Sequence, residues 1–271
     1  MTAIVRSALF VPGSRPERFA KALATGADAV IVDFEDAVED HLKEQARQNL
    51  ADFLQQQPDA KVWVRINGAG HPEQAADLAF CADQAGIAGV LLPKAENAEQ
   101  VQTATATGKP VWALIENAKG LLAVPAMAAC PGLQRLSFGG LDLGLDIGMA
   151  NGTPTAAMVY DQIRLTLLLH SRVNGLQPPL DTVYPAFDDA EGFSANVRHC
   201  RDMGLVGGLC IHPRQVAVMH DALKPAEREL DWARRVVEAS KSGAAAYQVD
   251  GQMVDAPVLG RARRILAMVG E

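Results

Sequence analysis

Charged side chains follow several short apolar runs in this sequence. Glu116 follows VWALI, Asp142 follows LSFGGL, and Arg65 follows VWV. Mg2+ typically takes one or two protein carboxylates and leaves its other octahedral positions to water and substrate oxygens. Glu116 and Asp142 together would therefore form a magnesium site, although each carboxylate alone is as readily a helix cap or a solvated loop charge.

Arg65 and a pair of glycines could bind the ligand. The planar guanidinium of Arg65 can hold a substrate carboxylate through two parallel N–H donors, a task for which lysine is less suited. The alternative is an ion pair with Asp33 or Asp36, and we favour ligand binding. Gly139 and Gly140 let the backbone approach a ligand closely, and an exposed amide at Gly140 could bind a carboxylate; the alternative is a simple tight turn.

Five acidic residues occupy the eight positions of DFEDAVED, residues 33–40. A metal ion could not use so many carboxylates directly. Glu35 and Asp36 are expected to hold metal-bound waters, whereas Glu39 and Asp40 favour a helix N-terminus.

Other polar side chains are open to two interpretations. Arg15, Arg18 and Lys21 could bind phosphates or form a solvated helix face. His212 precedes a proline, and structural hydrogen bonding suits it better than acid–base catalysis. The sequence contains no P-loop, no GxGxxG fingerprint and no GxSxG elbow, so covalent serine chemistry has no support.

Eight apolar, β-branched-rich runs would position these side chains. Helical patterns of about 10–20 residues separate the runs, which predicts parallel strands joined by helices. The expected fold is an α/β, (β/α)8 TIM barrel, in which the carboxyl ends of all strands share one face and their polar residues converge. The runs cover residues 6–13, 29–36, 61–67, 88–94, 111–117, 135–142, 181–187 and 207–213. The converging residues would be Glu35, Asp36, Arg65, Asn67, Lys94, Glu116, Asp142 and His212.

The barrel is expected over residues 1–222. Residues 223–271 are expected to form a C-terminal helical extension and flap that belong to the same domain. The flap is the turn-rich segment AAAYQVDGQMVDAP, which reads as a hairpin, carries Asp255 and precedes a last helix.

Composition favours a cytoplasmic protein with a small ligand. The 271 residues carry a net charge of −7 without basic clusters, which argues against nucleic acid or an anionic membrane as the partner. The four cysteines lack zinc-site spacing and are expected to be reduced and mostly buried. No basic leader and no apolar stretch of about 18 residues is present.

Nine sequence blocks, in order, carry a family resemblance. They are RSALFVPGSRPERFAKA, IVDFEDAV, VRIN, LLPKAE, LIENAKG, FGGLDLGLDIG, DTVYPAFDDAEGF, CIHPRQV and GQMVDAP. The chain resembles the citrate lyase beta subunit-like acyl-CoA lyases of the HpcH/HpaI aldolase/citrate lyase superfamily. The match is specific in combination and runs across nearly the whole sequence.

The resemblance implies roles for particular residues. It places Mg2+ on Glu116 and Asp142, Arg65 on the substrate oxygens, and coenzyme A near the loop after the first strand. It makes Asp255 an acid–base residue that reaches the site of a neighbouring subunit, in a homotrimer. Arg65 and Asp255 would then be catalytic, and Arg65, Gly140, Asp142 and Glu116 would contact the substrate.

The implied reaction is a reversible Claisen-type cleavage. A 3-hydroxyacyl-CoA with a carboxylate beside its hydroxyl, such as malyl-CoA or citramalyl-CoA, would give acetyl-CoA and a 2-oxo acid. Two positions depart from the family pattern. Gly208 stands where many relatives have lysine, and Leu141 stands where relatives often have an acid before the metal-binding aspartate.

Three alternatives remain open at this point. A coenzyme A-independent aldolase for 4-hydroxy-2-oxo acids would use the same carboxylate pair. A malyl-CoA thioesterase or a malate synthase-like enzyme would use the same enolate chemistry. A non-catalytic subunit of a larger complex would keep the fold alone, but the presence of Glu116, Asp142, Arg65 and Asp255 speaks against it.

Overall fold

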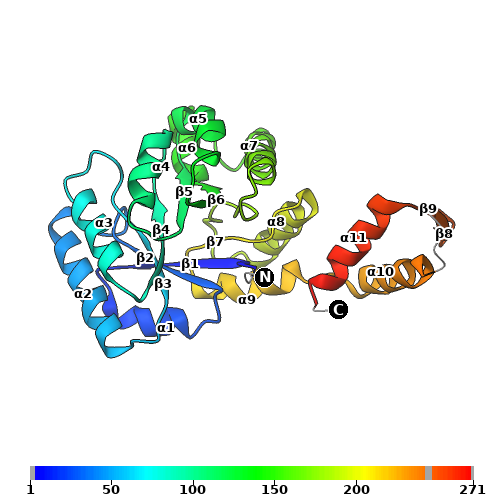
Figure 1. Ribbon diagram of the computed structural model, residues 1–271, viewed down its shortest axis with the longest axis horizontal. Coiled ribbons are helices and arrows are strands. Elements are labelled where there is room, and N and C mark those ends of the chain that lie inside the picture. The colour runs from blue at the N-terminus through cyan, green and yellow to red at the C-terminus, as the bar shows by residue number, and fades with distance from the viewer. Residues whose placement is uncertain (1–3, 242–245, 270–271) are drawn as a thin grey trace. The chain divides into compact units, whose positions relative to one another are not determined.

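The computed structural model describes residues 4–241 and 246–269 and divides into two compact units (Figure 1). The first unit covers Met1–Ala222 and the second Leu223–Glu271. Within the described residues, no helix is long and apolar enough to cross a membrane. All four cysteines are free and buried, as the sequence indicates.

A curled parallel sheet of seven strands forms the centre of the first unit. The order is β6-β5-β4-β3-β2-β1-β7, so consecutive strands are neighbours except where β7 adds beside β1. Such neighbours bring their carboxyl ends to one edge of the sheet. The strands are β1 (Ser7–Pro12), β2 (Ala29–Asp33), β3 (Val62–Arg65), β4 (Ile87–Leu92), β5 (Val111–Ile115), β6 (Leu133–Phe138) and β7 (Gly208–Cys210).

One of the eight expected strands, the run at residues 181–187, is not formed, and a complete closed barrel is not shown. The run that begins at Asp181 makes only isolated parallel bridges, Leu180 with Ser137 and Asp181 with Gly208. Pro178 and Pro179 precede the run and Pro185 lies within it, and a proline has no N–H for a sheet ladder. Arg164 holds the Asp181 carboxylate through two hydrogen bonds of 2.8 and 3.0 Å, which fixes this short segment between β6 and β7.

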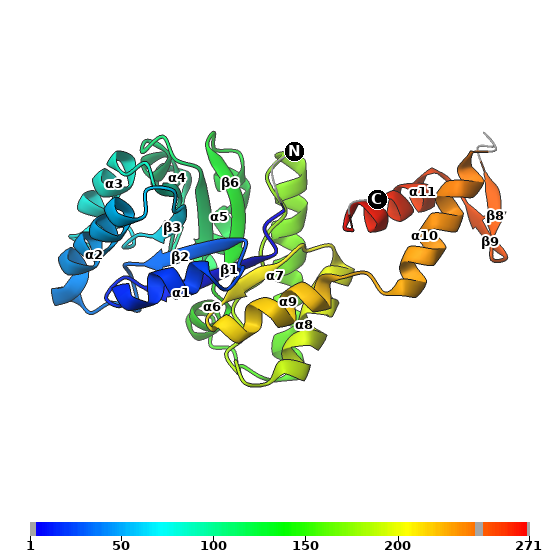
Figure 2. The ribbon, with the colours of Figure 1, turned by 90° about the horizontal axis from the view of Figure 1, so that it is seen from below.

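Helices follow the strands and lie on the outer side of the sheet, as α2, α3 and α4 show in Figures 1 and 2. Two of them were not expected: α6 directly after β6, and α9 after β7. The helices are the 3-10 turns η1 (Pro16–Arg18) and η2 (Asp40–Leu42), then α1 (Phe19–Leu23), α2 (Lys43–Gln56), α3 (Gln74–Asp83), α4 (Ala98–Thr105), α5 (Ala118–Ala128), α6 (Gly140–Asp146), α7 (Pro154–Val173), α8 (Ala190–Met203) and α9 (Pro213–Leu223).

Two stacked tryptophans fill much of the space inside the curled sheet. The rings of Trp63 on β3 and Trp112 on β5 lie 3.9 Å apart and nearly parallel. Gly89, on the strand between them, makes room for this stack, since a Cβ there would lie 2.2 Å from the Trp63 ring. The sheet interior is therefore packed with large and small residues that complement each other.

The second unit has its own small core. It contains α10 (Glu227–Ser240), the antiparallel pair β8 (Tyr247–Val249) and β9 (Gln252–Val254), and α11 (Ala256–Ala267). Asp250 and Gly251 connect the strands with φ of 52° and 77°, the left-handed pair that a two-residue hairpin turn requires. The hairpin expected from the sequence is present.

The substitution Gly89→Ala tests the packing inside the sheet. The new methyl group has no space beside Trp63, and overpacking of this kind typically costs about 1–3 kcal/mol. We expect the variant to unfold at lower urea concentration, followed by far-UV circular dichroism. Gly68→Ala is the matched control, because its Cβ would meet nothing closer than 4.0 Å. Equal losses in both variants would contradict the tight packing at Gly89.

Candidate functional site

Arg65, at the carboxyl end of β3, organises the charged edge of the sheet. Its Nε donates to Asp33 Oδ1 at 2.7 Å and its Nη2 to Asp33 Oδ2 at 2.5 Å. Its Nη1 lies 3.1 Å from Glu35 Oε2 and 3.5 Å from Asp36 Oδ2. Burial opposes the charge of Arg65, but the three carboxylates outweigh it and raise the pKa of the guanidinium. The ion pair considered as the alternative role of Arg65 is therefore present.

The sequence indicates Asp33 only as a possible partner of Arg65. In the structure, Asp33 also fixes the turn that follows β2. Its Oδ1 accepts the N–H of Glu35 at 2.9 Å, and its Oδ2 accepts the N–H of Ala37 at 3.1 Å. These bonds hold Glu35 and Asp36 at the end of β2. Asp33 directly ends the continuous apolar run of β2, AVIV, and this position at the end of a buried strand was the available signal.

Lys94 follows β4 and contacts the same acidic pair. Its Nζ donates to Glu35 Oε1, and it donates to Asp36 Oδ1 at 3.1 Å. Burial raises the pKa of Glu35 above its ordinary value, more than the Arg65 charge lowers it. Burial also acts upward on Asp36, but the hydrogen bond with Glu35 and the charges of Arg65 and Lys94 bring its pKa below the ordinary value.

Glu116 is a buried carboxylate, 4% exposed, directly after β5. Burial raises its pKa to about 7, although the Arg65 charge and the N–H of Lys94 act in the opposite direction. That N–H donates to Oε2 at 2.7 Å. A Cβ on Gly139 would lie 2.6 Å from Oε1, so the carboxylate extends from β5 to the loop that follows β6.

Asp142 lies in the same loop region as Gly139, in the first turn of α6. Its side chain is exposed and forms no hydrogen bond or ion pair with any described residue. A buried carboxylate and an open one thus come from neighbouring strand ends. The part of the chain that the structure describes holds no group of three or more metal-ligating side chains, so a metal here would need water or substrate oxygens to complete its coordination. The donor set fits Mg2+.

Gly140 does not offer a free amide. Its N–H donates to Thr182 Oγ1 at 2.7 Å, and its carbonyl accepts from the Tyr160 hydroxyl at 2.8 Å. A substrate carboxylate would have to displace Thr182 to bind this amide. The substrate contact of Gly140 stays a prediction, and the structure places Gly140 at the start of α6 rather than in a simple tight turn.

Two other residues expected at the site make structural contacts. Asn67 donates through Nδ2 to the buried Asp77 at 2.6 Å, and Arg47 binds the other oxygen of Asp77 at 2.7 Å. His212 accepts the N–H of Arg214 through Nδ1 at 3.2 Å, and its ring stacks on Phe187. His212 therefore fits the structural role that the sequence favoured.

Asp255 belongs to the second unit and caps α11. Its Oδ1 accepts the N–H of Val258 at 3.3 Å, an arrangement that stabilises the start of the helix. The side chain is half-buried. Its catalytic role stays a prediction.

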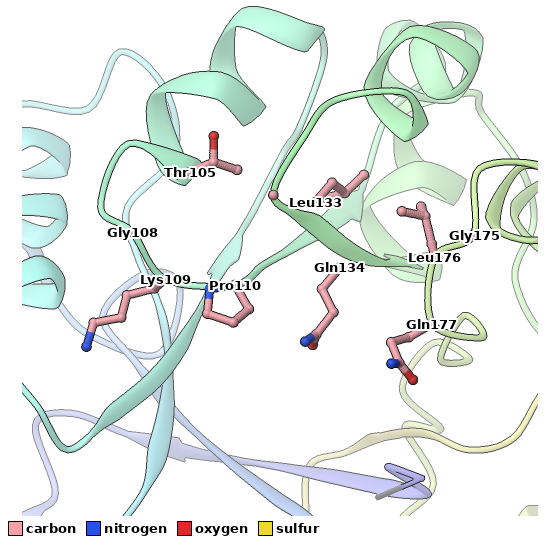
Figure 3. Close-up of a pocket in the computed structure, with 10 residues that line it drawn as sticks. Thr105, Gly108, Lys109, Pro110, Leu133, Gln134, Gly175, Leu176 and Gln177 are labelled. Carbon is pink, nitrogen blue, oxygen red and sulfur yellow. The ribbon is translucent and has the colours of Figure 1, made fainter. Parts of the chain in front are cut away.

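Two cavities lie at different ends of the sheet. One of about 410 Å3 is at the carboxyl end of β1, lined by Pro12, Ser14, Arg15, Arg18, Ala37, Glu39 and Leu42. Another of about 550 Å3 lies at the amino ends of β5 and β6, where Lys109 and Gln134 contribute side chains (Figure 3). Lys109 is the one charged residue among the described residues that line the second cavity, and it donates to the carbonyl of Gln84. This cavity lies at the amino ends of the strands, away from the acidic edge.

Sequence comparison assigns the chain to a family. The profile of the family described as HpcH/HpaI aldolase/citrate lyase matches residues 6–213. The chain belongs to this family. The match covers every strand of the HpcH/HpaI aldolase/citrate lyase sheet described above, together with Arg65, Glu116 and Asp142.

Proteins similar to this HpcH/HpaI family member are named for different activities. A citrate lyase subunit beta-like protein of Mycobacterium tuberculosis is 39% identical over 97% of this chain and 95% of that protein. A (3S)-malyl-CoA thioesterase of Cereibacter sphaeroides is 35% identical over 97% and 93%. An L-malyl-CoA/beta-methylmalyl-CoA lyase of the same species is 31% identical over 96% and 93%.

A solved structure shares the fold over the full length. The CitE protein of Mycobacterium tuberculosis, crystallised with magnesium, acetoacetate and coenzyme A, has a TM-score of 0.86 and 36% sequence identity, covering 100% of both chains. The resemblance seen in the sequence is thereby confirmed.

The substitution Glu116→Gln tests the burial of the carboxylate. Because its pKa is raised to about 7, ionisation of Glu116 destabilises the folded protein as pH rises from its ordinary pKa to 7. We expect the variant, measured in EDTA, to gain stability relative to the original protein between pH 4.5 and pH 8, by at most about 3 kcal/mol. Urea unfolding across this pH range measures the difference.

The exposed, uncharged Gln55 on α2 supplies the control for this series. Gln55→Asn should change stability by a similar amount at every pH. A Glu116→Gln difference that stays constant from pH 4.5 to pH 8 would show that Glu116 ionises as freely in the folded chain as in the unfolded one.

Proposed function

We propose that this protein is a Mg2+-dependent acyl-CoA lyase that cleaves a 3-hydroxy-carboxyacyl-CoA, such as malyl-CoA or citramalyl-CoA, to acetyl-CoA and a 2-oxo acid. The observation that carries the proposal is the carboxylate pair: Asp142 is open and unpartnered among the described residues, and Glu116 reaches its loop. The magnesium and coenzyme A in the solved CitE structure support the choice of cofactor and substrate class. We also propose that the sheet closes as a (β/α)8 barrel through Leu180 and Asp181.

Glu116 and Asp142 would hold the metal. Mg2+, when bound, would supply positive charge to the hydroxyl and carboxylate oxygens of the substrate. Arg65 has one Nη2 N–H without a partner among the described residues, and this donor would stabilise negative charge on the oxo-acid portion. Glu35 and Asp36 would accept hydrogen bonds from water in the site.

Asp255 would move the proton at the other product. In cleavage the hydroxyl on the third carbon would give its proton to water in the site and become the oxo group, the electron pair of the broken bond would go to the second carbon, beside the thioester, and the protonated Asp255 would deliver a proton to that carbon. In condensation the ionised carboxylate abstracts this proton. The family resemblance supports a position in the site of a neighbouring subunit.

The cavity beside β1 would receive the phosphates of coenzyme A. Arg15 and Arg18 line it, and Arg15 forms no ion pair with the described residues. Among the described residues that line it, Glu39 is the only acid. Two guanidinium groups beside a cavity suit a diphosphate, which accepts paired N–H donors.

A thioesterase is the second candidate function. The 35% identical relative named (3S)-malyl-CoA thioesterase favours it, because that identity exceeds the 31% to the named lyase. Both reactions would use the carboxylate pair, and they differ in whether water attacks the thioester. An aldolase that does not use coenzyme A would share the pair without the basic cavity.

The deciding experiment is product analysis with L-malyl-CoA and citramalyl-CoA, in Mg2+ and in EDTA. We expect metal-dependent release of acetyl-CoA, reduced about a hundredfold or more in Asp255→Asn, since an amide cannot transfer the proton. Asn retains the helix cap, so comparison with Asp255→Ala separates proton transfer from helix stability. Release of free coenzyme A and malate would instead establish the thioesterase, and cleavage of 4-hydroxy-2-oxo acids alone would establish the aldolase.

We propose a homotrimer as the assembly. One face of α7 carries exposed apolar side chains at Met158, Leu165, Leu169 and Val173. Their spacings of about four and seven residues place them along one side of the helix, as in helices that pack against a partner.

Leu165→Glu combined with Leu169→Glu tests this face. We expect the trimer mass to be replaced by the monomer mass in light scattering, because two charges cannot be buried in an apolar interface. Gln45→Glu combined with Gln48→Glu adds the same charge to the exposed side of α2 and should leave the mass unchanged. A trimer that survives the α7 changes would place the interface elsewhere.

A further inference from the structure

Lys94 has a backbone conformation that its sequence does not explain. Its φ is +47°, and among the described residues only Asp250 is another non-glycine with positive φ. Asp250 lies in a hairpin turn that requires this conformation, whereas Lys94 follows Pro93 at the end of β4. A left-handed conformation is unfavourable for a lysine, so other contacts must stabilise it here.

At the left-handed Lys94, two successive backbone amides donate to different partners. The Lys94 N–H donates to Glu116 Oε2 at 2.7 Å, and the next amide, of Ala95, returns to the backbone of β5 by donating to the Leu114 carbonyl at 3.1 Å. One backbone amide after β4 therefore donates to a side chain instead of to the backbone of β5. It fixes one oxygen of Glu116 and leaves the other, Oε1, against Gly139 in the loop that leads to Asp142.

The Lys94 side chain has a separate task. Its ammonium contacts Glu35 and lies 3.1 Å from Asp36, the two acids that Arg65 also contacts through Nη1. Without the ammonium, Arg65 alone would face these carboxylates. Both carboxylates would then draw their contacts from the guanidinium, which the proposed reaction needs for the substrate.

We propose that Lys94 is a positioning residue with two separable parts. Its left-handed backbone amide orients Glu116 for the metal, and its ammonium holds Glu35 and Asp36 so that Arg65 keeps a donor for the substrate. This inference rests on the proposed function. It predicts that the two parts respond differently to substitution.

Glycine and alanine at position 94 separate the parts. Both remove the ammonium, but glycine adopts the left-handed conformation without strain, whereas alanine retains the strain and loses the contacts that offset it. By isothermal titration calorimetry without substrate, we expect Lys94→Gly to bind Mg2+ within about threefold of the original protein. Lys94→Ala should bind about tenfold more weakly, a factor that corresponds to ~1.4 kcal/mol. Both variants should release acetyl-CoA with a lower kcat than the original protein, because both lack the ammonium.

Thermal unfolding in EDTA tests the backbone without metal. Lys94→Gly should melt several degrees above Lys94→Ala. At Gln48, on the exposed side of α2, the order should reverse, because glycine destabilises an ordinary helix relative to alanine. Lys94→Asn, which tolerates the left-handed conformation, should follow the glycine variant.

The outcomes distinguish this inference from the proposed function. If the original protein binds Mg2+ and the glycine and alanine variants bind it equally, the role of the Lys94 backbone is overturned. If Lys94→Gly keeps full kcat, the role of the ammonium is overturned. If the folded original protein does not bind Mg2+, while Lys94→Gly still melts above Lys94→Ala, the strained backbone stands and the proposed metal site fails.

Discussion

Arg65 and Asp33 lie opposite each other in the register of β2 and β3, and the two hydrogen bonds between them determine how the acidic edge is built. A slip of one residue would move Arg65 to the other face of the sheet, so the register and the site depend on each other. The same Asp33 carboxylate orders the turn that carries Glu35 and Asp36. One ion pair therefore links strand pairing to the placement of the acids around it.

The charges at this edge do not balance. Asp33, Glu35, Asp36 and Glu116 carry four carboxylates, and Arg65 and Lys94 supply two positive charges, which leaves a formal charge of −2 when all are ionised. Burial is the main cause of the raised pKa of Glu116, and the Glu35 charge adds to it, whereas the charges of Arg65 and Lys94 act in the opposite direction. The proposed divalent cation would offset the excess and favour the ionised form of Glu116, as bound metal ions do generally.

The sequence predicted the strand ends well because parallel strands align their carboxyl ends whatever the details of the loops. Seven strands and the Asp250–Gly251 hairpin followed from apolar runs and turn residues. The strand expected at residues 181–187 is not formed, because Pro185 lies within the run, Pro178 and Pro179 precede it, and none of them has an N–H for a sheet ladder. The helix α6 was missed because its two initial glycines read as a turn.

The sequence predicts which residues lie at the site better than it predicts the hydrogen bonds that they form. Thr182, 42 positions away in the chain, takes the Gly140 amide, and no local pattern announces that contact. Asn67 likewise turns to Asp77 because α3 brings a buried carboxylate beside it. Short-range patterns specify which residues reach the edge, whereas tertiary packing decides which of their donors stay open.

Two of the three tryptophans lie in the first unit and the third lies in the second, so tryptophan signals can be used to follow folding. Trp63 and Trp112 are stacked inside the sheet, while Trp232 lies on α10 and contacts Arg261. Near-UV circular dichroism depends on such fixed aromatic packing and is lost when tertiary packing loosens. A protein with Trp232 replaced by phenylalanine would therefore keep tryptophan in the sheet alone, and its near-UV tryptophan signal, compared with that of the original protein, would distinguish the unfolding of the two units without any added label.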